Sequence, residues 1–115
     1  MRLLHQRKRE LLIVQMEGEL DHHSADTVRK ELDHLLEDPT IIHLLLNFKK
    51  LQFMDSSGIG VIIGRFKTIS QRGGKIGIIE VNNQIQKILE VSGLLKIVNI
   101  YDSLQDALDN MLGVK

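Results

Sequence analysis

The stretch Ile41-Ile-His-Leu-Leu-Leu-Asn-Phe48 is nearly all apolar and begins with two β-branched residues. Its length is that of a strand, and it lacks the alternation of apolar and polar residues that marks a strand with one wet face. Strands that read in this way are covered on both faces, as in parallel sheets flanked by helices. The stretch therefore predicts the central strand of an α/β domain.

The residues before this strand predict a strand pair and one helix. Leu3 to Gln6 and Leu11 to Met16 are apolar segments on either side of a charged turn, and the pair is expected to close near Gly18. Apolar residues at i, i+4, i+7 and i+8 then predict an amphipathic helix from about residue 24 to 37, which stops before Pro39.

Helices and strands alternate after the central strand. The expected elements are a helix at 57–71 ending at Gly73-Gly74, a strand at 75–81, a helix capped by Asn82 or Asn83 and ended by Gly93, a strand at 96–101, and a last helix capped by Ser103 with Leu104 facing inward. The order β-β-α-β-α-β-α-β-α predicts one domain over residues 1–115. Its sheet is expected to be mixed and mostly parallel, with four to five strands and about four helices.

Composition excludes several classes of function. The formal net charge is +0, and only three Phe and one Tyr are present, so neither a general attraction to nucleic acid or anionic lipid nor base stacking is expected. The chain has no cysteine, which excludes disulfides and thiolate metal sites. Because its start lacks the apolar core of a signal peptide, we expect a cytoplasmic protein without direct contact to nucleic acid or membrane.

The segment Met54-Asp-Ser-Ser-Gly-Ile-Gly-Val-Ile-Ile-Gly64 opens the second predicted helix. Asp55, Ser56 and Ser57 are residues that cap helices, because their side-chain oxygens accept hydrogen bonds from free N–H groups of the first turn. The three glycines need another explanation, since each costs a helix interior about 1 kcal/mol relative to alanine.

A helical wheel offers one explanation for the glycines. It places Ser57, Gly60 and Gly64 on the outward side with Val61 beside them, opposite Ile59, Ile63 and Phe66. We therefore expect a smooth strip on which another chain can dock. The same wheel leaves Ser56 nearer the buried edge.

Three kinds of chemistry compete with a docking strip. Gly58, Gly60 and Gly64, followed by the acidic Glu80, resemble a dinucleotide fingerprint, but the stretch from Phe48 to Gly58 is longer than its tight first turn. A nucleophilic serine in the G-x-S-x-G pattern is absent. Asp21-His22-His23 could suggest a metal site, but the side chains of such neighbours are expected to point apart, so we predict no metal and no cofactor.

Four blocks resemble the STAS domains and, within them, the bacterial anti-sigma factor antagonists of the sigma F branch in sporulating bacteria. The blocks are Gly18-Glu-Leu-Asp-His-His23, Leu46-Asn-Phe48, Phe53-Met-Asp-Ser-Ser-Gly-Ile-Gly-Val61 and Val91-Ser-Gly-Leu94. The resemblance covers nearly the whole chain. The Met-Asp-Ser-Ser-Gly block is its most specific part.

The resemblance implies a regulator without catalytic activity that is a monomer when free. Its unphosphorylated form is expected to bind an anti-sigma factor that is also an ATP-dependent serine kinase, and so to release a sigma factor. The kinase is expected to phosphorylate Ser56, with Ser57 as the alternative, and a serine phosphatase to reverse this. The expected partner-binding residues are Glu19, Asp21, Asp55, Ser56, Ser57, Gly58, Gly60, Val61 and Gly64.

Overall fold

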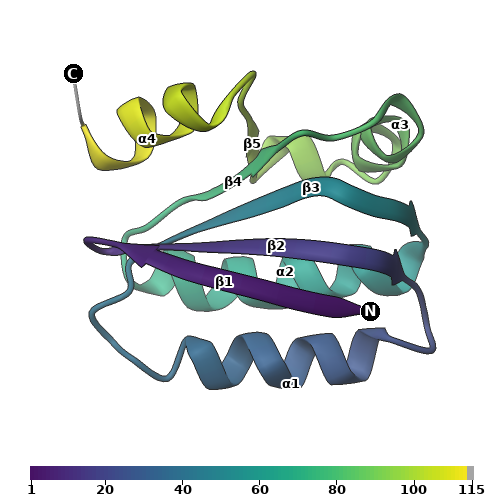
Figure 1. The fold of residues 1–115 in the computed structure, drawn as a ribbon, viewed down its shortest axis with the longest axis horizontal. Coiled ribbons are helices and arrows are strands. Elements are labelled where there is room, and N and C mark those ends of the chain that lie inside the picture. Colours follow the sequence, from purple (N-terminus) through teal and green to yellow (C-terminus); the bar gives the residue numbers. More distant parts are fainter. Residues whose placement is uncertain (114–115) are drawn as a thin grey trace.

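The structure is a computed structural model that describes residues 1–113, so the last two residues of the expected domain lie outside it. The described residues form one sheet with the strand order β1-β2-β3-β4-β5 (Figure 1). The strands are β1 (Arg2–Lys8), β2 (Leu11–Leu20), β3 (His43–Met54), β4 (Ile76–Ile79) and β5 (Asn99–Ile100). Only β1 pairs antiparallel, against β2, which confirms the predicted mixed and mostly parallel sheet.

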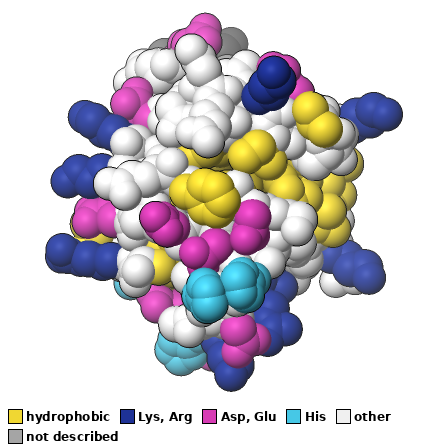
Figure 2. All heavy atoms as spheres, turned by 90° about the vertical axis from the view of Figure 1, so that its right-hand side faces the viewer, with side chains coloured by type: hydrophobic (Ala, Val, Ile, Leu, Met, Phe, Trp, Pro, Cys, Tyr) yellow, Lys and Arg dark blue, Asp and Glu magenta, His cyan; other side chains and the backbone are white. Residues whose placement is uncertain are grey.

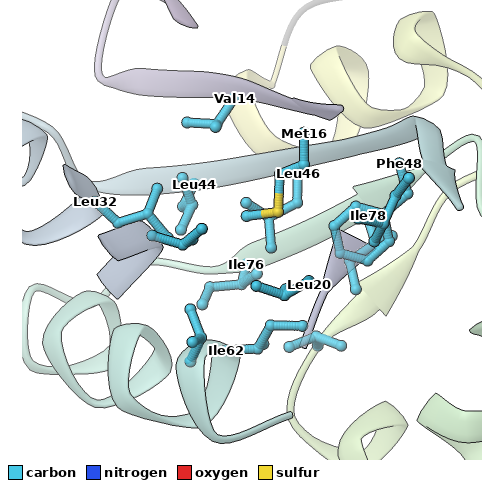
Figure 3. Packing of buried hydrophobic residues seen from close by; sticks show 14 of the residues in the cluster. Val14, Met16, Leu20, Leu32, Leu44, Leu46, Phe48, Ile62, Ile76 and Ile78 are labelled. Atoms are coloured by element: carbon cyan, nitrogen blue, oxygen red, sulfur yellow. The ribbon is translucent and has the colours of Figure 1, made fainter. Parts of the chain in front are cut away.

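Strand β3 is the centre of the core, as its sequence predicts. Leu44, Leu46 and Phe48 point to one side of the sheet and belong to the larger apolar cluster (Figure 3). Leu45 points to the other side and belongs to the smaller cluster. All four side chains are at most 1% exposed. At about 25 cal/mol per Å² of apolar surface removed from water, this two-sided burial is a large stabilising contribution for so short a segment.

The helices divide between the two faces of the sheet. They are α1 (Ala25–Leu35), α2 (Ser56–Gln71), α3 (Asn83–Val91) and α4 (Leu104–Leu112), in the order that the sequence predicts. The first three contribute to the larger cluster, whereas α4 covers the smaller one. Figure 1 shows α1 below the strands, α2 passing behind β1 and β2, and α4 above the strands. None of the helices within residues 1–113 combines the length and apolarity that crossing a bilayer requires.

Several predicted boundaries are wrong. Strand β3 continues six residues beyond Phe48, to Met54, and β2 continues beyond Met16 to Leu20. The two strands pair over this whole length through two register shifts, and this pairing holds polar residues in the extended conformation. The last predicted strand, residues 96–101, contains only the two-residue β5, and its first residue belongs instead to the 3-10 turn Leu94–Lys96. Leu104 is also 42% exposed, because α4 covers only part of its face of the sheet.

Two arginines join elements that are distant in the chain. The guanidinium of Arg72, at the end of α2, donates hydrogen bonds to the carbonyl oxygens of Leu36 and Ile41. Arg65 is 8% exposed and its Nε lies 3.0 Å from a carboxylate oxygen of Asp33, so α2 is paired to α1. These contacts fix how α1 lies beside α2.

His43, the one polar residue near the start of the central strand, is held in its neutral form. Its Nδ1 accepts a hydrogen bond from the backbone N–H of Lys75 at 3.0 Å, which joins the starts of β3 and β4. Burial lowers the pKa of His43, and the charge of Lys75 adds to this while Glu10 opposes it. Protonation would remove the acceptor of the Lys75 N–H.

We predict that His43 makes the protein less stable in mild acid. A histidine whose folded pKa lies below the unfolded value of about 6.5 binds its proton preferentially in the unfolded chain. Its contribution to the free energy of unfolding is therefore present above that value and is lost as the pH falls toward the folded pKa. His43→Asn retains an acceptor that does not titrate. Urea unfolding at pH 7.5 and pH 5 should show a larger loss for the wild type than for His43→Asn, and equal losses would contradict the prediction.

Candidate functional site

The candidate site lies where β2 and β3 end, at the loop before α1 and the first turn of α2. Figure 2 shows this face, on which hydrophobic side chains gather in one patch directly beside a group of acidic side chains. Two touching histidine side chains lie at the border of the acidic group. The carboxyl ends of neighbouring parallel strands meet at one edge of a sheet, which is where functional groups of α/β folds collect.

The carboxylate of Asp55 organises this edge. One oxygen accepts a hydrogen bond from the backbone N–H of Ser57 at 2.8 Å and so caps α2. The other accepts from the backbone N–H of His22 at 3.3 Å, which ties the loop after β2 to the head of α2. The predicted capping function of Asp55 is confirmed, and such a cap is typically worth about 1 kcal/mol.

The loop between β2 and α1 has an internal framework of its own. One Asp21 carboxylate oxygen accepts from the backbone N–H groups of His23 and Ser24 at 2.9 and 3.1 Å. Partial desolvation raises the pKa of Asp21, but these hydrogen bonds outweigh it and the net shift is downward. The Ser24 hydroxyl donates to the carbonyl oxygen of Glu19 at 2.7 Å. Glu19 itself lies in β2, opposite Phe53 of β3.

Two adjacent serines begin α2, and the wheel assigned their exposure wrongly. Ser56 is exposed, whereas Ser57 is half-buried. Ser57 lines a hollow between α1 and α2 together with Ala25, Gly60 and Val61. The wheel could not account for α1, which covers this flank of α2. The hydroxyl that reaches solvent at the head of the helix is therefore that of Ser56.

The three glycines of α2 have different physical reasons. A Cβ on Gly58 would lie 2.6 Å from Cγ of Met54 and 3.0 Å from Cγ of Leu20, so Gly58 is required by internal packing. A Cβ on Gly60 or Gly64 would meet no other described atom within 4 Å beyond its own helix backbone and chain neighbours. Packing within residues 1–113 therefore does not account for Gly60 and Gly64.

The apolar part of the expected strip lies on the other flank of α2. Val61, predicted to face outward, is 5% exposed because α1 packs beside it, whereas Ile63, predicted to be buried, is 48% exposed. Ile59 lies one turn before Ile63 and borders a hollow of about 290 Å³ between α2 and α3. We call this hollow the α2–α3 groove, and it is lined by Ser56, Ile59, Lys87, Ile88, Val91 and Ser92.

The α2–α3 groove was not predicted from the sequence. Val91 is the most prominent of its residues, with 81% of its surface exposed at the end of α3. The sequence pattern of α3 could have indicated an exposed apolar residue, because Val91 is apolar but lies outside the buried stripe that Ile85 and Leu89 mark. Pairing this residue with the head of α2 required the tertiary structure, since the two elements are joined only through β4.

The structure speaks against a dinucleotide site through the cap of α2 and not through the length of the preceding turn. The connection from β3 to α2 is short, because β3 ends at Met54 and α2 begins at Ser56. The length of this turn therefore does not exclude a dinucleotide. The cap does disfavour one, because the Asp55 carboxylate already accepts from the Ser57 N–H and places a negative charge where a pyrophosphate would bind.

The histidine pair also differs from its prediction. The rings of His22 and His23 do not point apart, because both residues lie in a turn, and their centroids are 3.9 Å apart. Within the described residues, no group of three His, Cys, Asp or Glu side chains is placed to hold a metal ion.

We predict opposite effects of alanine at Gly58 and at Gly60. Gly58→Ala should lower the free energy of unfolding by about 1–3 kcal/mol, because the new methyl group overpacks against Met54 and Leu20. Gly60→Ala should raise it by up to about 1 kcal/mol, since alanine is the better helix former and the space is open. Denaturant unfolding of both variants checks the pair, and a stabilised Gly58→Ala chain would refute the packing argument.

Comparisons with known proteins agree with this fold. The family model described as STAS domain matches residues 3–107. The chain is 47% identical to the anti-sigma F factor antagonist of Paenibacillus polymyxa over 90% of its own length and 88% of that protein. This relative carries the name of a regulatory binding protein and not of an enzyme.

Solved structures have the same fold. A putative anti-sigma factor antagonist from Thermotoga maritima superposes with a TM-score of 0.89 at 23% identity, covering 96% of this chain and 94% of that one. The Bacillus cell fate determinant SpoIIAA in its phosphorylated form gives a TM-score of 0.73 at 25% identity, covering 95% of this chain and 98% of that one. This chain therefore belongs to the STAS domain family, and its relatives from Paenibacillus polymyxa and Lysinibacillus sphaericus are anti-sigma F factor antagonists.

Proposed function

We propose that this protein is an anti-sigma factor antagonist controlled by phosphorylation of Ser56. Its unphosphorylated form binds an anti-sigma factor that is also a serine kinase, and the bound sigma factor is released. The kinase transfers the γ-phosphoryl group of ATP to the Oγ of Ser56, and ADP and a proton leave. The observation that carries this proposal is an exposed Ser56 hydroxyl that borders the apolar α2–α3 groove and directly follows the capping carboxylate of Asp55.

The chemistry of the face indicates the chemistry of the partner. Glu19, Asp21 and Asp55 supply negative charge on one side of Ser56, and the α2–α3 groove supplies apolar surface on the other. An apolar centre beside charged groups is the usual anatomy of a specific protein interface. We infer that the kinase presents basic side chains to these three carboxylates and an apolar side chain to the α2–α3 groove.

A phosphate on Ser56 would change this interface without unfolding the domain. It adds about −1.5 to −2 charge beside the Asp55 carboxylate, while the N-terminus of α2 offsets about 0.3–1 kcal/mol of the repulsion. Ser56 is exposed, so no core residue has to move. A partner that docks over Ser56 would have to desolvate the phosphate, which costs several kcal/mol in an interface, and each 1.4 kcal/mol is a factor of ten in affinity.

The remaining parts of the proposal follow the sigma F branch. The sigma factor is one that acts in sporulation, and a serine phosphatase removes the phosphate and restores binding. The antagonist acts in the cytoplasm, needs no cofactor, and is a monomer when free. Gly60, with open space above it, keeps the head of α2 accessible to the partner's backbone.

The kinase should phosphorylate Ser56 and not Ser57. The wild type, Ser56→Ala and Ser57→Ala are each incubated with the kinase and ATP, and the site is located by peptide mass spectrometry. We expect one phosphoryl group on the wild type and on Ser57→Ala but none on Ser56→Ala, because the Ser57 side chain is half-buried against α1. Phosphate on Ser57 of the wild type would reject the site assignment.

Charge in the α2–α3 groove should weaken partner binding. Val91→Asp should lower affinity for the kinase in the presence of ADP by about tenfold or more, because a carboxylate then faces an apolar side chain of the partner. Leu104→Asp is the matched control, since Leu104 is also exposed but lies on α4, on the opposite face of the sheet. Calorimetric titration of both variants measures the difference, and equal affinities would exclude the groove from the interface.

A further inference from the structure

A single lysine lies in the α2–α3 groove beside Ser56. Lys87 comes from the middle of α3 and Ser56 from the first turn of α2, so two helices bring an ammonium group and the exposed hydroxyl to one hollow. The other lining residues carry no charge. A long side chain of this kind can lay its apolar stem along the groove while its ammonium group stays in water.

Lys87 is also uncommitted within the protein. It forms no ion pair with any residue in the 1–113 range, whereas Arg7, Arg29, Lys30 and Arg65 all do. The nearest carboxylate in sequence to Ser56 is that of Asp55, and its two oxygens already accept from the Ser57 and His22 N–H groups. Lys87 is therefore a free cation at the site where the proposed modification would place a dianion.

We propose that the ammonium group of Lys87 pairs with the phosphate on Ser56 and closes the α2–α3 groove from within the chain. This inference rests on the proposed phosphorylation of Ser56. The pair forms a charge-assisted hydrogen bond, which is among the stronger contacts available at a surface. The flexible stem of lysine lets its ammonium group follow the phosphate without movement of α3.

Closure of the groove gives phosphorylation a second effect on binding. The first effect is that a docking partner has to desolvate the phosphate. The second is that the bridge to Lys87 would cross the hollow lined by Ile59 and Ile88, whose apolar side chains a partner would contact. The free chain has an open groove, and the phosphorylated chain has a covered one. The fold stays the same in both, because Lys87 and Ser56 are both exposed.

The bridge can be tested without the kinase. Phosphoserine is placed at position 56 during translation, and the ³¹P resonance is titrated by NMR in three chains: otherwise wild type, Lys87→Met and Lys67→Met. Lys67 is the matched control, an exposed lysine farther along α2. Asp55, next to the phosphoserine in sequence, and Asp21 and His22 of the loop that is hydrogen-bonded to Asp55 are unchanged in all three chains, so their effects cancel.

A nearby cation favours the dianionic phosphate and lowers its second pKa. We expect the ³¹P titration midpoint of Lys87→Met to lie roughly half a pH unit above that of the phosphorylated wild type, with Lys67→Met unchanged. The Ile88 and Val91 methyl resonances should also move on phosphorylation in the wild type and less in Lys87→Met. Equal midpoints in all three chains would overturn the bridge. Lys87→Gln serves as a second variant with the same expected shift.

The failure of this inference differs from the failure of the proposed function. A phosphoserine chain that binds the kinase as tightly as the unphosphorylated chain would reject the proposed switch. A ³¹P midpoint that ignores Lys87, in a chain whose kinase binding is lost, would reject the bridge and keep the switch.

Discussion

Burial of both faces of β3 is the constraint on which the other elements depend. Leu44 and Leu46 on one side and Leu45 on the other must all leave water, so helices have to cover both faces of the sheet. Because β2 and β4 run parallel to β3 on either side of it, the carboxyl ends of all three strands point to the same edge of the sheet. The site therefore follows from the fold. The loop before α1, Ser56 and the α2–α3 groove all lie at the edge where these strands end.

At that edge, one carboxylate links structure to function. Asp55 caps α2 and holds the loop after β2, so it sets the position of Ser56 relative to Asp21. The same charge would lie beside a phosphate on Ser56. Repulsion between the two is local, and the hydrogen bonds of Asp55 to backbone N–H groups resist any movement of the loop. A modification here changes the surface while the framework stays in place.

The glycines of α2 separate the demands of folding from those of recognition. Met54 and Leu20 leave no room for a Cβ at Gly58, and the close packing that glycine permits there offsets its low helix propensity. At Gly60 and Gly64, no packing within the described residues offsets the low helix propensity of glycine, and alanine would give a more stable helix. The open space at these two positions agrees with the docking that we propose for this helix.

Local patterns in the sequence determined the order of the elements, the two-sided burial of β3, the cap at Ser103, and the segments that hold the caps Asp55 and Asn82. The blocks around Ser56 also predicted the family. Tertiary structure alone decided which flank of α2 is open, because α1 covers Val61 and leaves Ile63 exposed. It also decided that Ser56 reaches solvent and that Lys87 lies beside it. A helical periodicity records how side chains are arranged around one axis, but the neighbours that cover each flank are set by packing between elements distant in the chain.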